Sequence, residues 1–132
     1  MNTPKNESRK GAIERKSYIF SIRVVNLYKY LCKEKHEYVL SKQLMRSGTS
    51  VGAMVREAQN AESRADFIHK LGIAQKECDE SLFWLSIMKD TKFINSVEYQ
   101  SMSSDAMELL KMIRSAIVTS KAIKNGRGKF YP

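Results

Sequence analysis

The chain has 132 residues, with 23 Lys or Arg against 14 Asp or Glu, so its formal net charge is +9. The length fits a single domain, and a hydrophobic fraction of 42% is too high for a disordered chain. The two prolines stand at positions 4 and 132 and glycines are few, which argues against an all-β fold and leaves no proline to break a helix in between.

Apolar residues recur at helical spacing in four segments. The first predicted helix begins at about residue 13 or 17 and ends at residue 34; the others span about 38–60, 64–91 and 97–124. In the first helix the core-facing residues step by four, three and four positions: Phe20, Val24, Leu27 and Leu31. The other segments carry stripes of similar period, so each has a face suited to a shared core.

The third and fourth predicted helices begin with capping sequences. Ser63 stands three residues before Asp66, and Asn95 stands three residues before Glu98, so each pair can satisfy free N–H groups at a helix start. Connections of about two to five residues make consecutive helices antiparallel neighbours. The sequence therefore predicts an all-α fold, an up-down-up-down antiparallel four-helix bundle.

We expect this bundle to form one domain with two flexible ends. The bundle covers residues 17–124, a basic N-terminal tail covers 1–16, and a C-terminal tail covers 125–132. The first 17 residues contain no apolar run, and no stretch approaches the ~18 apolar residues of a membrane span, so we expect a cytoplasmic protein without membrane association. Cys32 and Cys78 are expected to be small core residues and not a disulfide.

The second predicted helix contains a run of small residues. A glycine inside a helix costs about 1 kcal/mol relative to alanine, and close approach of another helix could offset this cost. We therefore predict close helix packing at Ser47, Gly48, Gly52 and Ala53. The alternative is a phosphate-binding glycine loop, which is disfavoured because no strand precedes the run and no Lys-Ser/Thr follows it.

Apolar residues also lie opposite the core stripe of the first and third predicted helices. Outer apolar faces of a bundle indicate a subunit interface, although scattered exposed hydrophobic residues are the alternative. The clustering favours the interface. The candidate residues are Ile22, Val25, Ile73, Phe83, Trp84 and Ile87.

The positive charge is unevenly distributed. Residues 1–35 contribute +6, residues 36–92 contribute zero and residues 93–132 contribute +3. In the predicted bundle the start of the first helix and the end of the fourth lie at the same pole, where a basic patch would attract phosphate. The alternative is a solvated basic surface. The candidate nucleic-acid-binding residues are Arg9, Lys10, Arg15, Lys16, Arg23, Lys29, Lys33, Lys121, Lys124, Arg127 and Lys129.

A specific run of residues spans the second and third predicted helices. It reads QLMRSGTSVGA at 43–53, followed by EA at 57–58, DFIHKL at 66–71, AQKE at 74–77 and WL at 84–85. These residues resemble the four helix bundle protein family, also called the 23S rRNA intervening-sequence protein family, and the resemblance covers about residues 18–124. Many relatives have proline in place of Gly52 and asparagine in place of Met54, so the chain resembles the subgroup without that proline.

The resemblance implies an all-α bundle and a homo-oligomer, with a ring of five favoured. Relatives encoded inside rRNA insertions, and one that assists a reverse transcriptase in diversity-generating retroelements, imply association with nucleic acid. The family has no established enzyme activity, so the resemblance implies no catalytic residues.

Metal and enzyme chemistry find little support. A di-metal bundle site needs a Glu from two helices and Glu-x-x-His from the other two, whereas the fourth predicted helix has no histidine. We expect no metal, no cofactor and no small-molecule substrate, and we expect Glu80 to form an ion pair with Lys76. The Arg-x4-His spacing of Arg64 and His69 resembles HEPN-type ribonucleases, in which Arg would hold phosphate and His would transfer a proton.

Three hypotheses follow. The first is a non-enzymatic homo-oligomeric bundle that binds RNA or a nucleoprotein partner through its basic pole. The second is a protein–protein scaffold or adaptor that binds no nucleic acid. The third, which the residues favour least, is a HEPN-like ribonuclease.

Overall fold

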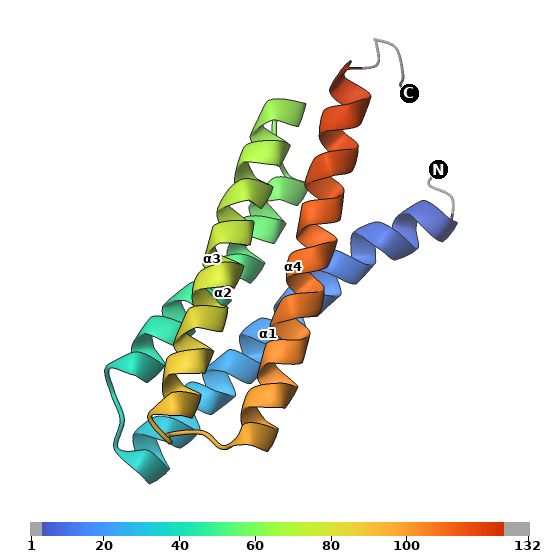
Figure 1. The fold of residues 1–132 in the computed structure, drawn as a ribbon. Coiled ribbons are helices and arrows are strands. Elements are labelled where there is room, and N and C mark those ends of the chain that lie inside the picture. Colours follow the sequence, from blue (N-terminus) through green and yellow to red (C-terminus); the bar gives the residue numbers. More distant parts are fainter. Residues whose placement is uncertain (1–3, 126–132) are drawn as a thin grey trace.

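The computed structural model describes residues 4–125, with side chains for residues 11–123. The described residues form α1 (Pro4–Lys35), α2 (Leu40–Gln59), α3 (Arg64–Asp90) and α4 (Ser96–Asn125) (Figure 1). Each helix packs against the next and α4 packs against α1, so α1 lies diagonal to α3, and α2 lies diagonal to α4, in the described bundle. The predicted all-α four-helix bundle is confirmed.

The first helix is longer than the sequence analysis predicts. It begins at Pro4, so residues 4–16, which the sequence assigned to the N-terminal tail, are part of α1. Proline suits the first helical position, and the Lys, Glu and Arg residues that follow are good helix formers. Figure 1 shows the start of α1 diverging from α4. The predicted C-terminal tail lies, after Asn125, outside the described residues.

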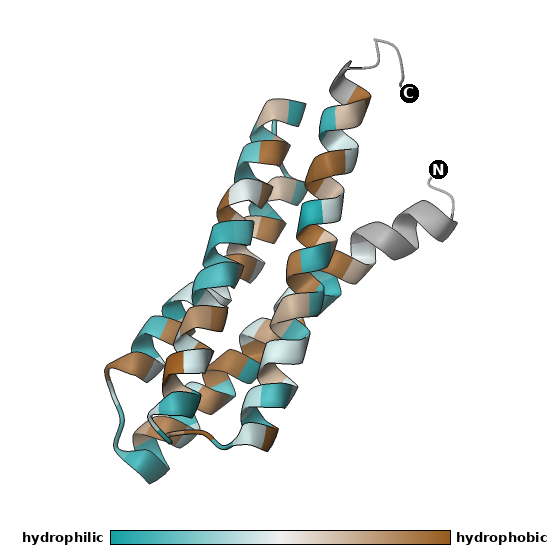
Figure 2. Ribbon diagram, in the orientation of Figure 1, coloured by the Kyte–Doolittle hydropathy of each residue, from teal (hydrophilic) through white to brown (hydrophobic). Residues whose placement is uncertain are grey.

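The core contains apolar residues from all four helices. Figure 2 shows hydrophobic and hydrophilic residues alternating along each helix. Of the stripe predicted for α1, Leu27 is partly buried and the other three residues are almost fully buried. Cys78 is buried within the core, Cys32 is half-buried, and both are free thiols. Burial raises the pKa of the Cys78 thiol to about 12, so this side chain acts as a small apolar group.

The starts of α3 and α4 carry the predicted caps. The Ser63 hydroxyl accepts the N–H of Asp66 at 3.0 Å, while the Asp66 carboxylate accepts the N–H of Glu62 at 3.4 Å. At α4, Asn95 and Glu98 each accept the other's backbone N–H at 2.8 Å. Both helices therefore begin with their free N–H groups partly satisfied by local side chains.

The start of α2 uses a cap that the sequence analysis missed. The buried carboxylate of Glu37, in the α1–α2 turn, accepts the N–H groups of Val39, Leu40 and Ser41 at 3.0, 2.9 and 2.7 Å. Burial raises the pKa of Glu37, but these hydrogen bonds outweigh it and hold the pKa below its usual range. Glu37 therefore fixes the turn as a charged group.

Candidate nucleic-acid interface

The two ends of the described chain lie toward the same end of the bundle (Figure 1). The start of α1, the α2–α3 turn and the end of α4 all point this way, and Arg64 joins two of them by donating to the Ser120 carbonyl at 3.5 Å. Arg15 of α1 and Lys121 of α4 are exposed here. Five further predicted candidates have no described side chain. Arg9, Lys10 and Lys124 belong to α1 or α4, and Arg127 and Lys129 lie outside the described residues.

Two of the predicted binding residues instead connect α1 to α4. Lys16 lies 3.0 Å from the Glu108 carboxylate and 3.5 Å from that of Asp105. Arg23 pairs with Asp105 at 2.6 Å and donates to the Ser101 hydroxyl at 2.7 Å. Their charge is thus balanced by acids on α4, where the two helices cross.

The pKa of Lys16 reflects the same arrangement. Burial lowers it, but the hydrogen bond and charge of Glu108 and the charge of Asp105 more than compensate, so the pKa is raised. The remaining candidates on α1, Lys29 and Lys33, are exposed and lie toward the opposite end of the bundle. The predicted basic residues therefore do not form one continuous patch.

The small residues of α2 contact two different helices. A Cβ on Gly48 would lie 2.8 Å from Val24 Cγ2, and one on Gly52 would lie 2.7 Å from Ser21 Oγ, so both glycines pack against α1. Ser47 is buried on the side of α3, where its hydroxyl lies 2.9 Å from that of Ser81. Ala53, which we predicted to share this close packing, is exposed.

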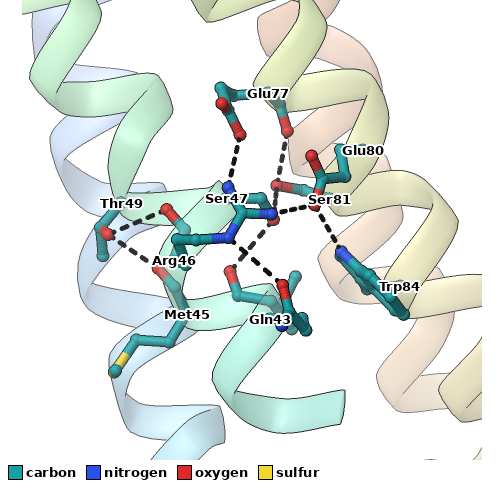
Figure 3. Close-up of polar contacts among 10 residues, drawn as sticks. Gln43, Met45, Arg46, Ser47, Thr49, Glu77, Glu80, Ser81 and Trp84 are labelled. Atoms are coloured by element: carbon teal, nitrogen blue, oxygen red, sulfur yellow. Dashed lines mark hydrogen bonds and ion pairs between the residues drawn. The ribbon is translucent and has the colours of Figure 1, made fainter. Parts of the chain in front are cut away.

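An ion-pair network covers the outer side of the α2–α3 contact (Figure 3). Arg46 pairs with Glu77 at 3.3 Å and with Glu80, and the Glu80 carboxylate also accepts the Trp84 indole N–H at 2.8 Å. Lys76 was the predicted partner of Glu80, and Arg46 was not among the predicted residues. Arg46 takes that place because the helix pairing brings it across from α2.

The part of the sequence that forms these contacts matches a known family. The model of the 23S rRNA-intervening sequence protein family matches residues 9–115. The chain belongs to this family. This confirms the resemblance inferred from the QLMRSGTSVGA run, which holds the arginine, the glycines and the buried serine just described.

The 23S rRNA-intervening sequence family fold is also seen in a solved relative. The chain is similar to a crystal structure of a protein with unknown function from the S23 ribosomal protein family of Bacteroides thetaiotaomicron, at 47% identity and a TM-score of 0.82. The match covers 83% of this chain and 97% of that chain. No curated protein matches the chain.

The predicted interface residues of this family member lie on two separate helices. On α1, Ile22 is 45% exposed and Val25 is half-buried. On α3, Phe83 is 55% exposed and packs edge-on against Trp84, with ring centroids 5.1 Å apart. Ile73 and Ile87 are half-buried. Because α1 and α3 are diagonal in the bundle, the two apolar faces point to different sides.

The described residues offer little for metal or acid–base chemistry. No group of three or more His, Cys, Asp or Glu side chains among them could hold a metal ion. His69 is exposed, and no hydrogen bond joins it to Arg64 within the part of the chain described. None of the helices over residues 4–125 combines the length and apolar character needed to span a membrane.

Proposed function

We propose that the chain is a non-enzymatic, homo-oligomeric protein of the cytoplasm that binds RNA or a nucleoprotein partner through the end of the bundle toward which its termini point. The supporting observation is the location of charge. Residues 1–10 contribute +2 and residues 124–132 contribute +3, so more than half of the net +9 belongs to these short segments. These segments adjoin the start of α1 and the end of α4, two helix ends that point apart (Figure 1) and that we call the terminal arms.

Salt-dependent RNA binding tests this proposal. Binding through phosphates releases counterions, so the affinity falls steeply as salt rises. We expect Arg15→Gln/Lys121→Gln and removal of residues 126–132 each to weaken binding and to reduce the salt slope. The matched control is Lys76→Gln/Lys111→Gln, which removes two exposed charges from the middle of α3 and α4. Affinity that is independent of salt would contradict the proposal and favour the alternative, a protein–protein adaptor.

The oligomer proposed here is a ring. Two different apolar faces that point to different sides of a subunit can join head to tail, one face of each subunit against the other face of the next. A head-to-tail contact between Ile22 of one subunit and Phe83 of the next closes into a ring when the rotation between neighbours divides a full turn, and five subunits is the size that the family resemblance implies. Light scattering tests the mass. We expect Phe83→Glu to release monomers, with exposed Val97→Glu as the control; a monomeric unaltered chain would refute the ring.

A further inference from the structure

A second basic site lies at the end of the bundle opposite the chain termini. There the last turn of α1 meets the α3–α4 turn around a pocket of about 370 Å³. Three lysines line it: Lys35 from α1, Lys89 from the last turn of α3, and Lys92 from the turn. This cluster was not predicted, because Lys89 and Lys92 fall within residues 36–92, which carry no net charge as a segment.

The charge of the pocket is positive even when its acids are included. Glu98 also lines the pocket, but its carboxylate is held by the N–H of Asn95 in the cap of α4. Lys89 lies 3.8 Å from the exposed carboxylate of Asp90. Lys35 and Lys92 make no ion pair within the described residues. Two lysines are therefore available to an anion that enters.

The walls of the pocket include aromatic surface. Tyr30 of α1, which is 39% exposed, and the half-buried Phe93 both line it. Lys89 is held over the ring of Tyr99, with its Nζ 4.8 Å from the ring centroid. Aromatic rings beside lysines are the combination that proteins use to bind single-stranded nucleic acid, since the rings stack on bases and the cations meet phosphates.

The backbone conformation of Lys92 independently indicates that its side chain has a role in this pocket. Its φ is 70°, a left-handed conformation that follows the end of α3. The N–H of Phe93 donates to the Met88 carbonyl at 2.9 Å, and that of Lys92 to the Lys89 carbonyl at 3.0 Å, which is the hydrogen-bond pattern of a Schellman motif. Glycine is favoured at this position. A lysine held there against its backbone preference suggests a role for the side chain.

We propose that this pocket binds one nucleotide of a single-stranded RNA, with its phosphate at Lys35 and Lys92 and its base against Tyr30 or Phe93. The inference rests on the proposed function in taking RNA as the ligand, but it names a different surface from the arms at the chain termini. A free nucleotide presents the same phosphate and base, so the experiment separates the two sources.

Binding of a fluorescent single-stranded RNA oligonucleotide and of adenosine monophosphate tests the pocket. At low salt we expect Lys35→Gln/Lys92→Gln to weaken RNA binding about tenfold. The control Lys76→Gln/Lys111→Gln, with the same loss of charge, should weaken it much less. RNA carrying 4-thiouridine should crosslink on irradiation to the peptide that contains Tyr30 or Phe93.

The outcomes distinguish the two proposals. Equal effects of the pocket and control variants, with no crosslink at either aromatic residue, would overturn the pocket. If the Arg15→Gln/Lys121→Gln variant alone loses RNA, the pocket is wrong and the terminal arms stand. If adenosine monophosphate binds in a Lys92-dependent manner and RNA does not bind, the pocket is a site for a free nucleotide. That result would refute RNA as the ligand of the pocket and as the ligand in the proposed function. If neither ligand binds the unaltered chain, both RNA proposals are refuted.

Discussion

Gly48 of α2 packs so closely on Val24 of α1 that a Cβ added to the glycine would lie 2.8 and 2.9 Å from the two methyl carbons of the valine. Val24 is fully buried and β-branched, so its methyl groups have little freedom to move aside. This contact supplies the physical reason for a glycine in the middle of a helix. The packing gained between α1 and α2 offsets the helix propensity that glycine loses.

Alanine substitutions at three glycines test this explanation. We expect Gly48→Ala to lower the free energy of unfolding by about 1–2 kcal/mol, because overpacking outweighs the gain in helix propensity. Gly52→Ala should cost less, since its nearest neighbour is the rotatable Ser21 hydroxyl. Gly72→Ala meets no described atom within 4 Å and should stabilise by about 0.5–1 kcal/mol. Urea unfolding measures all three, and a stabilised Gly48→Ala would contradict close packing.

The buried hydroxyl pair of Ser47 and Ser81 gives a second prediction. Ser81 also donates to the Glu77 carbonyl at 2.9 Å, so its hydroxyl is free to accept from Ser47. We expect Ser47→Ala and Ser81→Ala each to cost about 1 kcal/mol. The double variant should cost less than the sum, because either change alone removes the shared hydrogen bond. Additive losses in a double-mutant cycle would show that the two hydroxyls do not interact.

Glu37 predicts a dependence of stability on pH. Because its folded-state pKa is lowered, its charged form stabilises the fold above the pKa of the unfolded chain, and this contribution is lost as pH falls through the folded-state value. We expect Glu37→Gln to lower the free energy of unfolding at neutral pH by about 1 kcal/mol, as for loss of a helix cap. The difference from the unaltered chain should shrink in acid.

Exposed Glu34, at the end of α1, provides the control for this measurement. Glu34→Gln should leave the stability close to that of the unaltered chain at neutral pH. A constant difference between the unaltered chain and Glu37→Gln, from neutral pH to well below the ordinary glutamate range, would show that the charge of Glu37 is not what holds the α1–α2 turn.

Local patterns predicted the parts of the fold that depend on local chemistry. The core stripe of α1 and the caps at Ser63 and Asn95 follow from spacing within a few residues, and the structure has them. The cap of α2 was not predicted, because the N-cap residue itself, Val39, has no capping side chain. The capping residue, Glu37, precedes the helix and accepts from N–H groups two to four residues ahead of it. The extent of α1 was missed because its first turns are set by propensity and not by an apolar stripe.

Contacts between distant segments could not be read from the sequence. Arg23 and Asp105 are far apart in the chain, and their ion pair depends on where α1 crosses α4. The Arg46–Glu80 pair likewise depends on the register of α2 against α3. Net charge per segment predicted the excess of basic residues on α1 and α4. It could not predict the lysines that the turns bring together at the end of the bundle opposite the chain termini.

Lys92→Gly separates backbone strain from ligand binding at that far end. The Cβ of a non-glycine residue costs about 1–2 kcal/mol in the left-handed conformation of residue 92, and glycine avoids this cost. The gain is partly offset because glycine has greater freedom in the unfolded chain, so we expect the free energy of unfolding to rise by about 0.5–1 kcal/mol. RNA affinity should fall in the same variant, because the pocket loses a cation.

His36→Gly is the control: His36 is also left-handed, with φ 53°, but does not line the pocket. It should gain stability without losing RNA, as measured by thermal unfolding and RNA titration of the same samples. A Lys92→Gly variant that is more stable and binds RNA as tightly as the unaltered chain would leave the strain explained and the nucleotide pocket refuted.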